Sequence, residues 1–367
     1  MKYLNAILGT ILFTFYCSCS DSDNEEFMGA TEDMDPFPAT AYFPPVGADM
    51  WETISLETLG WSNSAAQELS AFLEEKDTKA FLIVKDGRIV LEYYLNGSNR
   101  DEPHPWYSVG KSATAFTAGV AQAEGLLSLH SPSSTYLGEG WSNLSQNEEM
   151  TIQVSHHLSM TTGLDYTVGN LNCTEAQCLH FLNIPDSFWY YHNAPYTLTQ
   201  DIISGATGVN FESYFDRKVK DPIGMDGQWL RLGFANVYFS TARSMARFGL
   251  LNLNKGFWEG SPILNDNSYF NAMTNSSQDM NKAYGYLWWL NGKENFRVPG
   301  SEMQFQGALI PNAPQDLIAG LGKDDQKLYI VPSQDLVIVR MGDATGESLL
   351  GPSSFDISLW DHINALF

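Results

Sequence analysis

The chain has 367 residues, of which 44% are hydrophobic and 13% aromatic, so it is long enough to bury a sizeable core and too apolar for a disordered chain. Its 43 acidic and 20 basic residues give a formal net charge of -23. This charge argues against binding to nucleic acid, or to an anionic bilayer through a basic patch.

The first 18 residues have the outline of a secretory signal peptide. Lys2 precedes an apolar stretch over residues 4–16, which is too short to remain as a membrane span. Cys19 follows a small residue and precedes an acidic run, so this region resembles a bacterial lipoprotein signal in which Cys19 becomes the lipidated first residue. The resemblance implies a cell-envelope protein that is anchored to a bacterial membrane by acyl chains. Plain cleavage, which would give a secreted protein, is the alternative.

A tether and then the folded domain follow the leader. Residues 19–45 are acidic and contain Pro, Met and Ala without periodicity, which predicts a tether. The folded domain is predicted over residues 46–367, with an amphipathic helix at residues 64–75. Apolar strands at residues 80–85 and 88–94 follow, joined by an Asp-Gly turn, and this pattern predicts a β-hairpin.

Ser108 and Lys111 lie three residues apart, where an aromatic loop gives way to an Ala-rich, proline-free segment at residues 112–124. This segment predicts a helix, and residues i and i+3 share one face of a helix. The pair is therefore the pattern of a serine nucleophile with a built-in lysine base, provided that an apolar wall lowers the lysine pKa. Unpaired N–H groups at the helix N-terminus also favour an oxyanion. A helix cap and a solvated charge are the alternative.

The long middle of the chain, residues 108–290, is mostly helical in pattern. Tyr166 and Trp288 are candidate walls of an acyl or leaving-group site, with core packing as the alternative. Cys173 and Cys178 are the only cysteines of the predicted folded domain, and in an oxidising envelope they can form a small loop disulfide or remain reduced. They lack histidines at ligand spacing, so no metal site is predicted.

Three histidines of this middle region, His156, His157 and His192, invite a Ser-His-Asp interpretation. The chain has no Gly-x-Ser-x-Gly elbow to present such a serine, which argues against a histidine triad.

A second pair of strands, at residues 327–331 and 335–340, precedes a closing helix at residues 355–367. Strands at both ends with helices between them predict an α+β fold. One antiparallel sheet is built from both termini, and a mainly helical region is inserted in it.

Several stretches, in order along the chain, resemble the serine β-lactamase and penicillin-binding-protein superfamily. They are Tyr107-Ser108-Val109-Gly110-Lys111-Ser112, Leu158-Ser159-Met160-Thr161-Thr162-Gly163-Leu164, Tyr191-His192-Asn193, Pro222-Ile223-Gly224-Met225 and Ala242-Arg243-Ser244-Met245-Ala246-Arg247-Phe248-Gly249. The likeness is greatest to beta-lactamase-related serine hydrolases, which include class C β-lactamases, esterases and 6-aminohexanoate-dimer hydrolase. It covers residues 42–367 and implies the beta-lactamase/transpeptidase-like fold.

The resemblance also implies roles for residues of the second and third family motifs. Tyr191 would pass the proton from Ser108 to the leaving group, as tyrosinate or as a relay, and Asn193 would orient the lysine or the substrate. The third motif departs from the family pattern. Lys323 would stand for its cation, two acidic residues follow, and a backbone N–H near Gln326 would complete the oxyanion hole. A charged turn without a catalytic role is the alternative.

These residues predict a serine hydrolase that acts by acyl transfer on a small-molecule ester or non-β-lactam amide. The acidic third motif argues against the alternative with the same chemistry, a β-lactamase or D-alanyl-D-alanine carboxypeptidase. A catalytically silent envelope binding protein is the alternative of another class. No metal, organic cofactor or obligate protein partner is expected.

Overall fold

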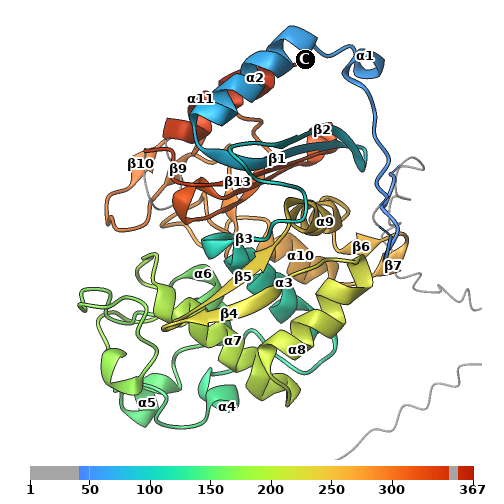
Figure 1. Ribbon diagram of the computed structural model, residues 1–367. Helices are drawn as coiled ribbons and strands as arrows, with labels where there is room; N and C mark the ends of the chain where they lie inside the picture. Colours follow the sequence, from blue (N-terminus) through green and yellow to red (C-terminus); the bar gives the residue numbers. More distant parts are fainter. Residues whose placement is uncertain (1–40, 49, 347–353) are drawn as a thin grey trace, which may run out of the picture. The chain divides into compact units, whose positions relative to one another are not determined.

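The computed structural model of the chain describes residues 41–48, 50–346 and 354–367 (Figure 1). These residues belong to one unit, Pro38–Phe367, whereas the unit Met1–Phe37 lies outside the described residues. The predicted leader and the lipidation site Cys19 therefore also lie outside them. None of the described helices combines the length and the apolar character that a membrane span requires.

A six-stranded antiparallel sheet brings the two ends of the domain together (Figure 1). Its strand order is β2-β1-β13-β12-β11-β8. The strands are β1 (Thr78–Lys85), β2 (Arg88–Tyr94), β8 (Trp289–Leu290), β11 (Ile318–Leu321), β12 (Lys327–Val331) and β13 (Leu336–Gly342). Because β1 pairs with β13, strands from both termini lie side by side. The predicted α+β class and antiparallel sheet are confirmed.

The β1–β2 hairpin turns at Asp86 and Gly87, whose φ angles of 51° and 81° are those of the predicted Asp-Gly turn. A Cβ on Gly87 would lie 1.8 Å from the carbonyl oxygen of Tyr42, so only glycine lets this segment approach. Further along, Arg247 donates to the carbonyl oxygen of Pro44 at 3.0 Å. The end of the predicted tether thus packs on the folded domain.

Helices cover both faces of the sheet (Figure 1). Helices α2 (Asn63–Glu75) and α11 (Ser354–Asn364) pack together over β1, and α9 (Ala242–Leu253) contacts β1, β12 and β13 from the other side. Strands β12 and β13 are consequently buried along nearly their whole length. Because helices cover both faces of these strands, their sequences are continuous apolar runs and do not alternate between apolar and polar residues.

The inserted region lies between β2 and β8 in the sequence. Its helices are α3 (Gly110–Ala123), α4 (Ser134–Leu137), α5 (Gln146–Glu149), α6 (Val154–Ser159), α7 (Asn193–Thr207), α8 (Phe211–Phe215) and α10 (Asn267–Met273), and α1 (Leu56–Leu59) precedes the sheet. A small sheet has the order β3-β5-β4, from His104–Pro105, Ala235–Ser240 and Gln228–Leu232. Helix α3 contacts α7, α10 and β11 and is buried on almost every side, so its many alanines allow close packing.

Short elements complete the domain. Two-stranded ribbons join β6 (Phe257–Trp258) to β7 (Ser261–Pro262) and β9 (Asn295–Phe296) to β10 (Phe305–Gln306). Single turns are η1 (Tyr107–Val109), η2 (Ala176–Cys178), η3 (Asp216–Lys220), η4 (Asp221–Ile223), η5 (Lys323–Asp325) and η6 (Pro332–Gln334). Of these, η1 and η5 position the site described next.

Candidate active site

Ser108 lies in the turn η1, which runs directly into helix α3. The preceding Trp106 is fully buried, and its indole Nε1 donates to Ser240 Oγ at 2.7 Å. Tyr107 then adopts a left-handed conformation, with a φ of 46°, that non-glycine residues seldom adopt. The anchored tryptophan and the bent backbone hold Ser108 at a fixed, half-buried position at the start of the helix.

Lys111 meets Ser108 as the spacing predicts. Its Nζ donates to Ser108 Oγ at 2.9 Å, and the residue is only 4% exposed. Burial lowers the pKa of Lys111 from 10.5 to about 7. No carboxylate of the described residues forms an ion pair with it. Near neutral pH a large fraction of the lysine is therefore uncharged and able to accept the serine proton.

Tyr191 also lies beside the lysine. Lys111 Nζ is 4.9 Å from the centre of the Tyr191 ring, which stacks on Trp289 with 5.9 Å between centroids. Burial raises the pKa of Tyr191 well above its usual value, and a hydrogen bond with Ser108 opposes this only in part. The hydroxyl is thus a neutral phenol, which suits a proton relay and not a tyrosinate base.

Asn193 is the first residue of α7, so the Tyr-x-Asn stretch ends at a helix start. Its side-chain Oδ1 is buried and has no hydrogen-bond partner among the described residues. This amide oxygen therefore has acceptor capacity that none of the described residues uses.

Two glycines near the end of β11 let the sheet edge approach the nucleophile. A Cβ on Gly320 would lie 2.9 Å from Val109 Cγ1, and a Cβ on Gly322 would lie 2.6 Å from Trp106 O and 3.4 Å from Ser108 N. The turn η5 therefore begins beside the Ser108 N–H, where a second oxyanion donor is needed. Glycine inside a strand signals close backbone approach, so Gly320 is a signal in the sequence from which this contact could have been found.

Lys323, the predicted substitute for the cation of the third motif, lies at the rim of this region. Its Nζ is 5.2 Å from the centre of the Tyr107 ring and 3.5 Å from the carboxylate of Asp324. The side chain is about half exposed, at 49%. Lys323 is thus close to the nucleophile's turn, with its charge partly compensated by the neighbouring acid.

The two residues after Asp324 face the interior. Asp325 is buried and forms an ion pair with Lys327 at 3.0 Å, while Lys327 also pairs with Asp356 at 2.8 Å. Gln326 is fully buried, and its amide donates to the carbonyl oxygen of Gly342 at 2.6 Å. The side chains of Asp325 and Gln326 therefore fix the η5 turn and do not reach a substrate.

The two predicted pocket aromatics have different positions. Tyr166 stacks on Tyr190, with 3.9 Å between centroids, and lines a small pocket that also includes His192. Trp288 is fully buried and stacks on Phe248 in the core. Trp288 therefore belongs to the core, and of the pair only Tyr166 lines a pocket.

The histidines are not placed as a catalytic triad requires. His157 is fully buried, and its ring nitrogens contact Ser133 Oγ at 2.9 Å and the carbonyl oxygen of Pro195 at 2.8 Å. Burial lowers the pKa of both His157 and His192 to about 4. Ser108 has its hydrogen bond with Lys111 instead of with a histidine.

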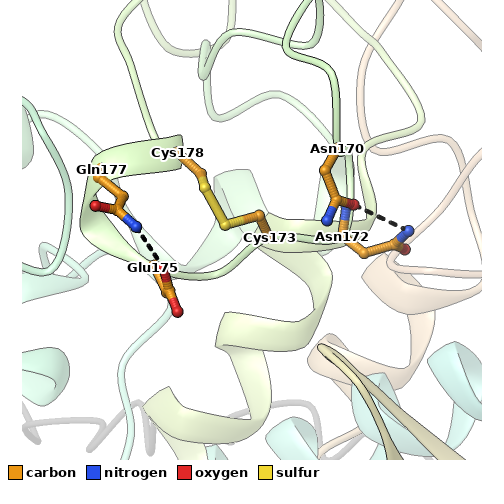
Figure 2. Close-up of a disulfide and its surroundings, with 6 residues drawn as sticks. All are labelled: Asn170, Asn172, Cys173, Glu175, Gln177 and Cys178. Atoms are coloured by element: carbon orange, nitrogen blue, oxygen red, sulfur yellow. Dashed lines mark hydrogen bonds between the residues drawn. A yellow bond between two sulfur atoms is a disulfide. The ribbon is translucent and has the colours of Figure 1, made fainter.

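Cys173 and Cys178 form a disulfide in the loop before α7 (Figure 2). Glu175 lies close to both sulfurs, but these are bonded to one another and the carboxylate accepts from Gln177 Nε2 at 2.6 Å. In the same loop, the carbonyl oxygen of Leu171 accepts from the N–H of Ala194 at 2.9 Å. The cross-linked loop thus supports the helix start that carries Asn193.

Comparisons with known proteins agree with this geometry. The Beta-lactamase family model matches residues 70–348. The 6-aminohexanoate-dimer hydrolase of Paenarthrobacter ureafaciens is 22% identical over 320 residues, which cover 75% of this chain and 74% of that protein. The sequence motifs described above resemble the same group of beta-lactamase-related hydrolases.

Solved structures share the fold. A Bacillus anthracis protein assigned as a 6-aminohexanoate-dimer hydrolase has a TM-score of 0.66 and 21% identity, with 88% of each chain covered. A penicillin-binding protein homologue from Caulobacter crescentus has a TM-score of 0.63 and 13% identity, covering 82% of this chain and 96% of the other. The beta-lactamase/D-alanine carboxypeptidase of Pseudomonas syringae has a TM-score of 0.60 and 16% identity, covering 82% and 98%.

Proposed function

This chain belongs to the beta-lactamase family of hydrolases, and from that premise we propose that it cleaves an ester or a non-β-lactam amide by acyl transfer through Ser108, Lys111 and Tyr191. One observation carries the proposal: a buried lysine without a carboxylate partner among the described residues donates to the hydroxyl of a half-buried serine at 2.9 Å. This is the arrangement that an activated serine nucleophile needs.

In the proposed reaction, neutral Lys111 takes the proton of Ser108 as Oγ attacks the substrate carbonyl carbon. The new C–O bond gives a tetrahedral oxyanion, held by the Ser108 N–H and by an N–H of the η5 turn. The bond to the leaving group then breaks, and the proton passes from Lys111 through the Tyr191 hydroxyl to the departing oxygen or nitrogen. Water repeats the sequence on the acyl-enzyme and releases the acid.

The surroundings of the third motif support an ester or a non-β-lactam amide over a β-lactam. A carboxylated substrate needs an uncompensated cation at the rim, whereas Lys323 shares its charge with Asp324 at 3.5 Å. The unpartnered Oδ1 of Asn193 and the aromatic wall at Tyr166 suit a substrate that combines an N–H or hydroxyl group with apolar surface.

We also propose that the mature protein is a lipoprotein of the bacterial cell envelope, anchored through Cys19. The proposal rests on the leader sequence alone. Metabolic labelling with an alkynyl fatty acid tests it: the full-length protein should be labelled and recovered with membranes, and Cys19→Ala should lose the label. Recovery of unlabelled, secreted wild-type protein would support plain signal cleavage instead.

The central experiment is labelling of the purified protein with a fluorophosphonate probe, followed by mapping of the modified peptide. We expect stoichiometric labelling at Ser108 that is abolished by Ser108→Ala and strongly slowed by Lys111→Ala. Turnover of p-nitrophenyl esters, a 6-aminohexanoate amide and a chromogenic cephalosporin then separates the substrate classes. Turnover of the cephalosporin alone would move the assignment to a β-lactamase, and absence of labelling in folded protein would favour a binding role.

A further inference from the structure

Lys111 has an unusual set of neighbours for a buried ammonium group. Its Nζ is 4.3 Å from the centre of the Tyr196 ring and 4.9 Å from the centre of the Tyr191 ring. Its hydrogen bond goes to Ser108 Oγ. The lysine therefore lies between two aromatic faces, and Tyr196, five residues after Tyr191 on helix α7, belongs to none of the motifs that predicted the site.

In the proposed reaction, these aromatic neighbours affect the stability of the charge that Lys111 acquires. When Ser108 attacks, its proton moves to Lys111, so a positive charge appears at a site that excludes water. The Ser108 oxygen becomes bonded to the substrate carbon at the same time and, once the leaving group has departed, is an ester oxygen, which is a weaker hydrogen-bond acceptor for the ammonium. The negative faces of aromatic rings are the remaining source of stabilisation for a cation within about 6 Å of the ring centre.

We propose that Tyr196 is a positioning residue for this reaction: its ring face stabilises the ammonium form of Lys111 after the lysine has taken the proton of Ser108. The inference rests on the proposed function, since it concerns the same lysine. It differs from the role of Tyr191, whose hydroxyl relays the proton, because Tyr196 acts through its ring alone.

The hydroxyl of Tyr196 is occupied on the side away from the reaction. Gln200 Nε2 donates to it at 3.3 Å and to Thr114 Oγ1 at 3.1 Å. Gln200 Oε1 in turn accepts from Asn236 Nδ2 at 3.0 Å. This buried polar chain fixes the plane of the Tyr196 ring against the lysine, and it explains why a tyrosine is found at this position.

Other titratable and charged groups around the lysine do not supply the same stabilisation. From η1 the neighbour is Ser108, and from the segment just before α7 it is Tyr191, which burial keeps neutral. Tyr284 lies behind Tyr191 and is likewise neutral, and Arg231 of β4 acts on Tyr196 with a positive charge. No described carboxylate perturbs Lys111, so the rings are the groups that favour its charged form.

The test is the pH dependence of fluorophosphonate labelling of the full-length protein in detergent. The wild-type rate should rise with pH through a midpoint near 7, because labelling requires uncharged Lys111. Tyr196→Leu removes the ring face, which destabilises the ammonium and lowers the midpoint by roughly 0.4 to 1.5 pH units. Tyr196→Phe keeps the ring and should keep the midpoint.

Two controls separate the ring from the polar chain and from misfolding. Thr114→Val removes one acceptor of Gln200 Nε2 but leaves the ring, its hydrogen bond from Gln200 and the bond from Asn236 in place, so we expect the wild-type midpoint and rate. Tyr196 can also be replaced by phenylalanine analogues with increasing fluorination. These keep the shape of the ring but reduce the negative potential of its face, so the midpoint should fall stepwise. This series remains informative if Tyr196→Leu does not fold.

The outcomes distinguish the two proposals. If the wild-type protein is labelled at Ser108 with a midpoint near 7 but neither Tyr196→Leu nor the fluorinated series moves that midpoint, only the role of Tyr196 is overturned. An equal shift in Tyr196→Phe would assign the effect to the hydroxyl chain and also overturn it. If folded wild-type protein is not labelled, the proposed function fails, and this inference fails with it.

Discussion

Replacement of Lys111 by methionine should abolish labelling and at the same time stabilise the protein at neutral and acidic pH. The reason is that the folded protein holds the lysine with a pKa of about 7, against an ordinary value of 10.5. Between these two values the unfolded chain binds the proton and the folded chain does not. The buried lysine therefore destabilises the fold fully below pH 7, and this cost disappears as the pH rises towards 10.5.

The size of the effect follows from the two pKa values. The pH-dependent destabilisation by Lys111 is about 5 kcal/mol at pH 6, about 3 kcal/mol at pH 8 and about 1 kcal/mol at pH 10. Lys111→Met removes it and adds a pH-independent change in packing. The free energy of unfolding of the variant minus that of the wild type should thus fall by about 4 kcal/mol between pH 6 and pH 10.

Urea unfolding of both proteins at several pH values measures this difference directly. Lys323→Met serves as the control, because it makes the same replacement at a side chain that is 49% exposed, and its difference at pH 6 should be much smaller than that of Lys111→Met. A difference for Lys111→Met that stays constant within about 1 kcal/mol from pH 6 to pH 10 would refute the view that burial neutralises this lysine.

Three further predictions concern the surroundings of the nucleophile. Tyr191→Phe keeps the ring and removes the relay hydroxyl, so ester turnover should fall by about 10²- to 10⁴-fold while the melting temperature changes little; unchanged turnover would exclude the relay. Gly322→Ala places a Cβ 2.6 Å from a backbone oxygen and should slow labelling on the order of a hundredfold, whereas Gly169→Ala, where a Cβ has nothing within 4 Å, should not. Asp325→Asn leaves Lys327 with a single acid and should lower the free energy of unfolding in urea by about 3 to 5 kcal/mol; retention of wild-type stability would show that the buried pair is dispensable.

The parts of the fold that could be predicted are those whose patterns are local. The hairpin of β1 and β2 follows from two apolar runs and an Asp-Gly turn, and its turn residues have the positive φ angles that this dipeptide favours. Helix α3 follows from its alanines, and Ser108 and Lys111 meet because their spacing is that of one helical turn. Each of these features needs only neighbouring residues.

Features that depend on contacts distant in sequence were not predictable in the same way. Tyr196 reaches Lys111 only because α7 packs against α3, and a tyrosine inside a helix has no local mark of that contact. Trp288 lies in an aromatic run that suits a pocket wall as well as a core, and its packing on Phe248 decides for the core. In the same way, the contact of Pro44 with Arg247 cannot be inferred from the composition of the tether.

Among the described residues two lysines are buried, and the contrast between them shows why only one is suited to chemistry. Lys327 is fully buried with carboxylates at 3.0 Å and 2.8 Å, so its ion pairs link η5 to α11. Lys111 is almost as buried, yet its partners are a hydroxyl and two ring faces. Carboxylates would keep its proton in place, and water would restore its ordinary pKa. Aromatic faces stabilise the ammonium less than carboxylates or water would. The lysine can therefore be uncharged before the attack of Ser108 and can keep the proton of Ser108 afterwards.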